Sequence, residues 1–328
     1  MASISRNYTV DIARLFGSFG VIAMHVPGTT AAARVINVIN WPLCVPFFYL
    51  ASLTFFILSL GNGTIGQIFN KTWQRLLIPF LCWTLIYLGL FLAKGILGGA
   101  KNHDFVWWRV LFYGESTVHL YFLPTLLLFQ ALAMSYYYLF VDKKADSKVG
   151  LALLAGSLFY LLWGYTHNCF GVSSIGVIVG IVIFIFAGFQ LAPHVLNVKR
   201  KPMFVIMGAV LVVFAIVCNY VGFRFRILDY PALFPLGGIG LLMISIGLPL
   251  AYLPKSIKYL CSLSYGIYLC HVIVLEAFEF LLERVLKIEL EYTSLLKMFV
   301  VIIAFALSAL IVHSIRQNKI LKKLLLGE

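Results

Sequence analysis

The sequence has few charged residues for its length, and this scarcity excludes a soluble globular protein. Only 11% of the 328 residues are Asp, Glu, Lys or Arg, whereas 62% are hydrophobic. A folded soluble surface needs far more charge than this composition provides. The apolar runs are continuous over about 20 residues, long enough to cross a bilayer as helices, and they lack the alternation of a membrane β-barrel. The composition therefore predicts an all-α, polytopic transmembrane helical bundle.

The sequence also lacks paired cysteine motifs and a cleavable leader. Its six cysteines are scattered without C-x-x-C spacing, so we expect reduced packing residues rather than a disulfide framework or a metal site. The first apolar segment contains Arg14 and has no basic region or small-residue cleavage site, so we expect it to remain as a helix. No soluble domain, low-complexity linker or internal repeat is visible. We therefore expect residues 1–328 to form a single integral-membrane domain.

Apolar segments divide the chain into ten predicted spans. They are residues 11–27, 40–61, 76–97, 119–141, 149–165, 171–191, 203–221, 232–252, 257–282 and 294–314. The first segment is short and polar, because an arginine and a histidine lower its hydropathy. The aromatic segment FVWWRVLFYG (105–114) is predicted to lie at the membrane interface.

Positive charge is concentrated in alternate connections between these spans. The net charge of +13 is therefore attributed to cationic loops facing an anionic membrane rather than to nucleic-acid binding. The cation-rich segments are five: the first holds Lys71 with Arg75; the second Lys143, Lys144 and Lys148; the third Lys199, Arg200 and Lys201; the fourth Lys255 with Lys258; and the C-terminal one Arg316, Lys319, Lys322 and Lys323. The other connections are poorer in cations and hold Arg34, Lys101, Arg109, Arg224, Arg226, Arg284 and Lys287. The positive-inside rule then predicts that both termini are cytoplasmic.

The first span, DIARLFGSFGVIAMHV, carries three ionisable residues at membrane depth. A charge inside a bilayer is costly unless it is paired or solvated, so such residues indicate a functional site. Arg14 and His25 lie eleven residues apart, about three helical turns and roughly 16 Å, and so share one face. Asp11 lies one turn before Arg14, where it can pair with the guanidinium or cap the helix.

Other polar residues at membrane depth have a structural interpretation beside the functional one. His119 opens the segment HLYFLP, where it can be an interfacial histidine or part of a site. Tyr268 and His271 belong to SLSYGIYLCH (262–271), and His271 can simply bond a backbone carbonyl. Arg75 can be a positive-inside anchor. His25 has fewer structural explanations, because it lies far along its span, just before a Val-Pro-Gly break.

These segments together resemble the membrane acyltransferase-3 family, whose members O-acylate glycans and other acceptors. DIARLFGSFGVIAMH is similar to the family's D-x-x-R followed by a histidine eleven residues after the arginine, and VPFFYLAS (45–52) to its F-F-x-x-S-G element. Three further motifs of the family are similar, in the family order, to KTWQRLLIPFLCW (71–83), HLYFLP (119–124) and SLSYGIYLCH (262–271). Ser52 is followed by leucine rather than glycine, and Arg75 stands where many members have several arginines.

The resemblance implies an integral-membrane O-acyltransferase of the bacterial cytoplasmic (inner) membrane. The co-substrate would be an acyl-CoA, most often acetyl-CoA, and the acceptor a hydroxyl of a cell-surface or lipid-linked glycan, with neither a metal nor a bound cofactor. An imidazole has an ordinary pKa of about 6.5, so His25 is the predicted catalytic base. Arginine matches phosphate geometry, so Arg14 and Arg75 are the predicted donor-binding residues. The predicted supporting residues are Asp11, Ser52, His119, Tyr268 and His271.

Two other classes of protein fit the composition. A transporter or flippase of a glycolipid or polysaccharide would also have many spans and buried polar groups. It would show pseudo-symmetric halves with broken helices in corresponding positions, and the sequence shows no convincing example. A structural membrane subunit would leave the spacing of Arg14 and His25 to chance.

Overall fold

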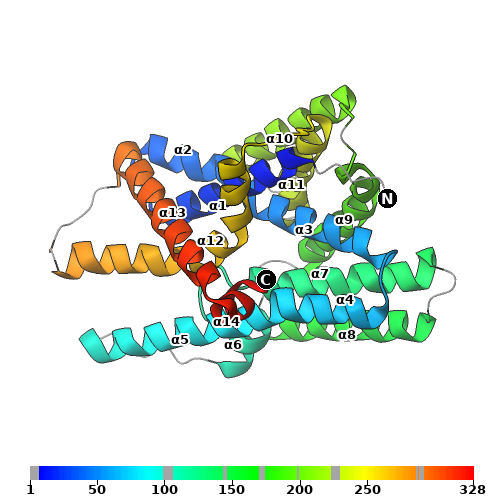
Figure 1. The fold of residues 1–328 in the computed structure, drawn as a ribbon, viewed down its shortest axis with the longest axis horizontal. Coiled ribbons are helices and arrows are strands. Elements are labelled where there is room, and N and C mark those ends of the chain that lie inside the picture. Colours follow the sequence, from blue (N-terminus) through cyan, green and yellow to red (C-terminus); the bar gives the residue numbers. More distant parts are fainter. Residues whose placement is uncertain are drawn as a thin grey trace. The chain divides into compact units, whose positions relative to one another are not determined.

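The computed structural model describes residues 7–98, 106–142, 146–169, 174–197, 199–222, 230–285, 287 and 292–328. Within these ranges every regular element is a helix, which confirms the predicted all-α fold (Figure 1). The chain divides into two compact units. The first unit comprises residues 1–58 and 172–313, and the second comprises residues 59–171 and 314–328.

All ten predicted spans coincide with helices, with ends that differ by a few residues. Eight helical stretches among the described residues are long and apolar enough to cross a membrane: Ala31–Leu60, Ile65–Ala93, Phe122–Val141, Ser147–Thr166, Gly176–Val195, Pro202–Val221, Lys255–Leu282 and Ser294–Gln317. The other two predicted spans are α1 (Tyr8–His25), which carries Asp11 and Arg14, and α11 (Tyr230–Gly247), whose apolar part covers Leu233–Gly247.

The first unit contains the helices that carry most of the predicted site. Besides α1 and α11, they are α2 (Ala31–Asn40), α3 (Cys44–Leu60) as far as Leu58, α9 (Ser174–Val195), α10 (Pro202–Val221), α12 (Lys255–Glu279), the π-helical η3 (Phe280–Val285), and α13 (Ser294–Gln317) as far as His313. Side chains define several helix starts: Asn7 accepts from the Thr9 amide and Thr30 from the Ala33 amide. Helix α2 was not among the predicted elements.

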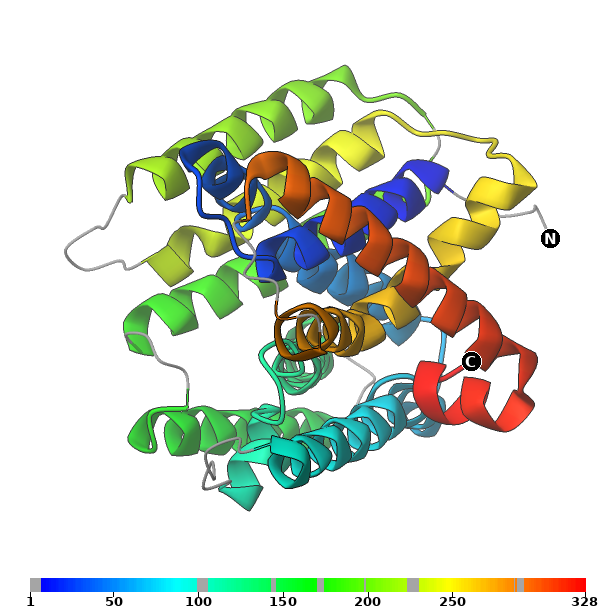
Figure 2. The same ribbon diagram turned by 90° about the vertical axis from the view of Figure 1, so that its left-hand side faces the viewer.

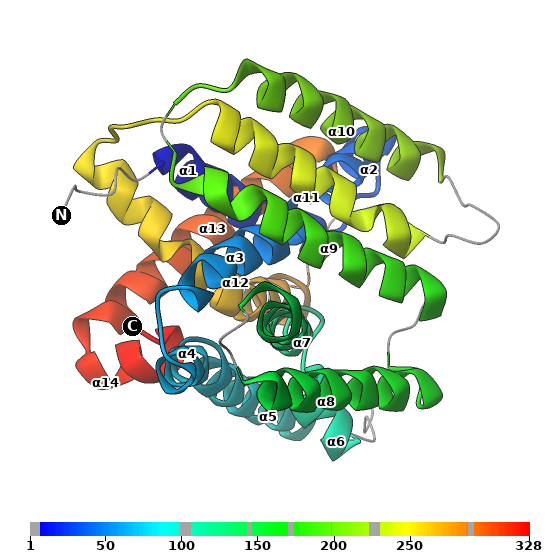
Figure 3. The same ribbon diagram turned by 90° about the vertical axis from the view of Figure 1, so that its right-hand side faces the viewer.

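Helices α9, α10 and α11 lie next to one another (Figure 3). The crossing of α10 and α11 depends on two glycines. A Cβ on Gly208 would lie 2.6 Å from the carbonyl oxygen of Gly240, and a Cβ on Gly240 would lie 2.6 Å from that of Gly208. Small residues let helix backbones approach closely in a membrane, where packing rather than the hydrophobic effect drives association.

Helix α1 is surrounded by other helices of the first unit. It packs against α12 and contacts α2 and α11. A Cβ on Gly17 would meet the ring of Phe48 on α3 at 3.0 Å, so this face of α1 has no room for a larger side chain. The start of α13, orange in Figure 2, lies beside the dark blue turn that links α1 to α2. Helix α1 is therefore packed against α2, α3, α11 and α12 of this unit.

The second unit is a smaller group of helices. It contains α4 (Ile65–Thr72), η1 (Trp73–Leu77), α5 (Ile78–Gly98), α6 (Trp107–Tyr113), α7 (Phe122–Tyr136), η2 (Tyr137–Val141), α8 (Ser147–Thr166), α14 (Lys319–Leu321) and η4 (Lys322–Leu326). Helices α7 and α8 run side by side (Figure 1), and Ser135 Oγ donates to the Gly150 carbonyl at 2.8 Å. Trp83 Nε1 donates to the Leu325 carbonyl at 2.9 Å, which ties η4 to α5.

The aromatic segment predicted at the interface forms α6 and contacts the end of α8. Arg109 Nη2 donates to the His167 carbonyl at 2.5 Å, and the rings of Tyr113 and Tyr160 stack with centroids 4.6 Å apart. Burial, together with the nearby Cys169, raises the pKa of Tyr113 to about 12, so this phenol stays protonated at physiological pH.

Several cations used to predict the membrane orientation lie outside the described residues, namely Lys101, Lys143, Lys144, Arg224 and Arg226. The cytoplasmic placement of both termini therefore stays a prediction.

Candidate functional site

The first turn of α1 is fixed by the residues at the end of α11. Asn7 Nδ2 donates to the Ser245 carbonyl at 3.0 Å, and Thr9 Oγ1 donates to the Leu248 carbonyl at 2.5 Å. Asp11 follows in the first helical turn and is buried, with 8% of its surface exposed. A carboxylate there is stabilised by the helix dipole. The predicted pairing of Asp11 with Arg14 stays a prediction.

The face of α1 that carries Arg14 and His25 meets α12. The Arg14 guanidinium lies close enough to Tyr265 to interact with it electrostatically. Near the other end of α1, the ring centroid of His25 lies 5.2 Å from that of His271, with the ring planes inclined by 42°. Arg14 and His25 thus both face the SLSYGIYLCH segment of α12, so that four polar side chains of the two motifs form two close pairs.

His271 is fully buried and is held by its own helix. Its Nδ1 lies 2.7 Å from the carbonyl oxygen of Tyr268, so Nδ1 carries the proton in that bond. The Tyr268 ring lies 5.9 Å from the His271 ring and 5.8 Å from that of Phe48 on α3. A continuous row of rings therefore runs from His25 through His271 and Tyr268 to Phe48.

His25 differs from His271 in its accessibility. His25 keeps part of its surface exposed, whereas His271 has none. A reactant can reach an imidazole only through exposed surface, so His25 is the member of the pair that can exchange a proton with a substrate. His271 is the buried ring against which the His25 ring lies.

Ser52 lies on α3, one turn after Phe48, and is half-buried. Residues four apart share a helix face, so Ser52 follows the ring row on the side of α3 that faces Tyr268.

Sequence reasoning missed Lys297 on α13, which is fully buried. Its Nζ donates to the Val26 carbonyl and to Asn37 Oδ1, both at 2.7 Å, directly beyond His25. The signal that identified Arg14 and His25, a charge inside an apolar run, was also present in SLLKMFVVIIAF. It was overlooked because a lysine near the start of a span usually anchors the helix at the interface.

The remaining two predicted residues, Arg75 and His119, belong to the second unit. Arg75 is exposed in η1, and a Cβ on Gly327 would lie 2.6 Å from the Arg75 Cα. Gly327 has a φ of +66°, so glycine suits both its backbone and the close contact. His119 is buried: its Nδ1 lies 2.8 Å from Thr117 Oγ1, and its ring meets that of Tyr87 edge-on at 5.2 Å.

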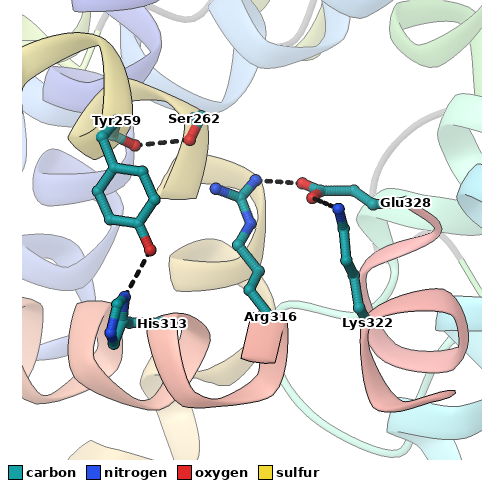
Figure 4. Close-up of polar contacts among 6 residues, drawn as sticks. All are labelled: Tyr259, Ser262, His313, Arg316, Lys322 and Glu328. Carbon is teal, nitrogen blue, oxygen red and sulfur yellow. Dashed lines mark hydrogen bonds and ion pairs between the residues drawn. The ribbon is translucent and has the colours of Figure 1, made fainter. Parts of the chain in front are cut away.

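Two further polar groups involve residues near the C-terminus (Figure 4). In the first unit, Tyr259 Oη lies 2.5 Å from His313 Nδ1, and Ser262 Oγ donates to the Tyr259 carbonyl at 2.6 Å. In the second unit, Arg316 and Lys322 share the Glu328 carboxylate, with Lys322 Nζ 3.5 Å from Glu328 Oε2 (Figure 4). Glu328 is exposed, and Arg316 and Lys322 are half-buried, and ion pairs with exposed members contribute little stability.

The chemistry of this site is that of nitrogen bases and cations. Within the described ranges, no three His, Cys, Asp or Glu side chains gather as a metal site requires. All six cysteines are free thiols. An accessible imidazole can take a proton from a hydroxyl, and a guanidinium can bind an anionic group.

Comparison with known proteins identifies the family. A family model described as an acyltransferase domain matches residues 7–314, a range that contains every predicted site residue. No curated protein and no solved structure matches the chain. The family match covers nearly the whole chain and agrees with the resemblance of its motifs. The chain belongs to the membrane acyltransferase-3 family and is an integral-membrane acyltransferase.

Proposed function

We propose that the protein transfers an acyl group, acetyl in the first instance, from cytoplasmic acyl-CoA to a hydroxyl of a cell-surface or lipid-linked glycan. The observation that carries this proposal is the position of His25. Its accessible imidazole ends the helix that also carries Arg14, and its ring faces His271 at 5.2 Å. Acyl transfer to a hydroxyl needs a base at the reacting carbonyl and an anion site for the distant phosphates of the donor, and one helix supplies both.

In the proposed reaction His25 acts as a general base. A ring nitrogen of His25 takes the proton of the acceptor hydroxyl while the hydroxyl oxygen attacks the thioester carbonyl. The C–S bond then breaks, the new ester forms, and the CoA sulfur leaves as a thiolate that recovers the proton from His25. Proton transfer by a positioned side chain contributes about 10²- to 10⁴-fold to a rate.

Arg14 is the proposed phosphate contact for the donor. The eleven-residue spacing places Arg14 about 16 Å from His25 along α1, a distance that the extended pantetheine arm of CoA can bridge. A guanidinium offers two parallel donors to a phosphate, which favours arginine over lysine. Arg75 is exposed, and its place in the family motif is the basis for proposing it as a donor-binding residue.

The other residues are proposed to support these two. The bond of His271 to the Tyr268 carbonyl fixes the tautomer and orientation of the ring that faces His25. Asp11 and Ser52 are proposed as supporting residues of the same activity. His119 is proposed as a supporting residue that acts only through packing, because it is buried, bonded to Thr117 and in contact with the Tyr87 ring. The proposed location is the bacterial cytoplasmic membrane with both termini inside, because acyl-CoA is a cytoplasmic donor.

The test is a transfer assay with purified protein in lipid nanodiscs. Acetyl-CoA labelled in its acetyl group is supplied with glycolipids extracted from the source cells, and succinyl-CoA is compared. We expect acceptor-dependent release of CoA and label in the glycolipid, measured by mass spectrometry. Surface glycans of cells with and without the protein should differ by the mass of the same acyl group. Absence of CoA release with either donor, together with unchanged glycans, would overturn the proposal.

A further inference from the structure

Lys297 is a buried cation in a position that is unfavourable for a lysine. Its surface is fully buried, and it lies in the first turn of α13, which begins at Ser294. Burial removes the hydration of the ammonium group. The N-terminal end of a helix carries a partial positive charge, so the dipole of α13 adds a second penalty. A lysine retained here needs compensating partners.

The partners of Lys297 lie at the end of α1 and on α2. Its Nζ donates to the carbonyl of Val26, the C-cap residue of α1, and to Asn37 Oδ1, each at 2.7 Å. The last carbonyls of a helix have no intrahelical partner and carry the negative end of its dipole, so a cation is favourable there. The ammonium therefore sits at the C-terminal end of α1, one residue after His25.

Two further bonds connect the start of α13 to the same turn. The Thr29 amide donates to the Tyr292 carbonyl at 3.1 Å, and the hydroxyls of Thr30 and Ser294 lie 3.4 Å apart. These bonds locate the turn after α1, but they act four and five residues beyond His25. Of these three contacts made by the start of α13, the bond of Lys297 to the Val26 carbonyl lies closest to His25 along the chain.

We propose that Lys297 is a positioning residue for acyl transfer, which holds the carbonyl end of α1 and thereby sets the place of the His25 ring against His271. The proposal rests on the proposed role of His25 as the base. It adds a residue on a third helix to the catalytic arrangement of α1 and α12. Without the ammonium, the last turn of α1 loses its partner and the His25 ring shifts from its place.

The test compares three variants in the nanodisc assay. Lys297→Met keeps an unbranched side chain of similar length and removes the charge. Asn37→Leu removes one of the two acceptors and is milder, because Asn37 is only half-buried. Ser308→Ala, at another fully buried position of α13, is the matched control, since it keeps the carbonyl that accepts from Cys270 Sγ.

We expect Lys297→Met to lower kcat by roughly 10²-fold, because a small misplacement of a catalytic group is that costly. The KM for acetyl-CoA should stay near its original value, because Arg14 is untouched. Asn37→Leu should lower kcat less, and Ser308→Ala should be normal. A merely structural lysine would reduce the yield of folded protein but leave kcat per folded molecule unchanged, and that result would overturn the proposal.

The position of His25 is measured separately by its rate of modification with diethyl pyrocarbonate, with exposed His313 as the internal reference. Lys297→Met should change the relative rate at His25, and Ser308→Ala should not.

This measurement separates the proposal for Lys297 from the proposal that His25 is the base. Full transfer by His25→Ala would reject His25 as the base, and an altered modification rate in Lys297→Met would still show that Lys297 sets the place of the His25 ring. An inactive His25→Ala with an unaltered rate and kcat in Lys297→Met would reject only the positioning role of Lys297. If Lys297→Met does not fold, Asn37→Leu decides by the same two readouts.

Discussion

His25 and His119 are both histidines of predicted spans, and each belongs to a segment that resembles a motif of the family. Their surroundings differ. His25 keeps exposed surface and faces a second imidazole, that of His271, at 5.2 Å. His119 is enclosed, with 2% of its surface exposed, its Nδ1 bonded to Thr117 and its ring against Tyr87. His25 is therefore the histidine that we propose as the base, whereas the contacts of His119 are those of a packed side chain.

The largest expected effect is on His25. We expect His25→Ala to fold and insert normally and to lose about 10²- to 10⁴-fold in kcat at any donor concentration, the usual contribution of a general base. Activity of the unaltered protein should also fall on the acid side, because a protonated imidazole cannot accept a proton. Transfer assays across pH, with acceptors that do not titrate, measure both. Near-normal turnover by folded His25→Ala would remove the distinction between the two histidines.

The next effect concerns Arg14, on the same face of α1. A charge-assisted hydrogen bond contributes about 1.5–3 kcal/mol, so Arg14→Ala should weaken CoA binding by roughly 10- to 150-fold. Unlike the defect of His25→Ala, this one should shrink at high donor concentration. Arg14→Lys should restore part of the affinity, because lysine keeps the charge and loses the fork. Calorimetry of CoA binding tests this, and unchanged affinity in Arg14→Ala would leave a structural role beside Tyr265.

A smaller effect is expected for His271. An asparagine amide can replace the Nδ1 donor to the Tyr268 carbonyl, so His271→Asn should fold while losing the ring that faces His25. We expect a loss of about 2- to 10-fold in kcat, the equivalent of one ordinary hydrogen bond. The control is His313→Asn, at an exposed position. A variant as inactive as His25→Ala would make His271 a reacting group, whereas unaltered kcat would assign it to packing.

The helices and the polar face of α1 could be predicted from the sequence, because hydropathy and the 3.6-residue repeat depend on neighbouring residues alone. The spacing of Arg14 and His25 predicted that both share a face. It did not predict that this face meets Tyr265 and His271, because the pairing of helices depends on the shapes of whole surfaces, such as the close contact of Gly17 with Phe48.

The position of Lys297 could not be predicted for a related reason. A lysine in the first turn of a span is equally compatible with snorkelling to the interface and with an internal bond, and the choice depends on which carbonyl lies opposite. Here the opposite group is the end of α1, about 270 residues away in the chain. Helix α2 was missed because AAARVINVIN contains an arginine and two asparagines and lies before the apolar run.

The smallest effect on catalysis is expected for His119, where the defect should be one of stability. Removing its buried ring leaves the Thr117 hydroxyl without its partner and a gap beside Tyr87, so His119→Ala should lower the free energy of unfolding by about 1–3 kcal/mol. Turnover per folded molecule should stay within about twofold, since no general-base contribution is lost. Thr117→Val removes the same bond from the other side and keeps its shape, so the double variant should be less destabilised than the sum of the single ones. Thermal unfolding in nanodiscs and kcat corrected for folded protein measure the two quantities. If His119→Ala were as stable as the unaltered protein but inactive, the enclosed imidazole would belong to the reaction, and enclosure would no longer separate a structural histidine from a catalytic one.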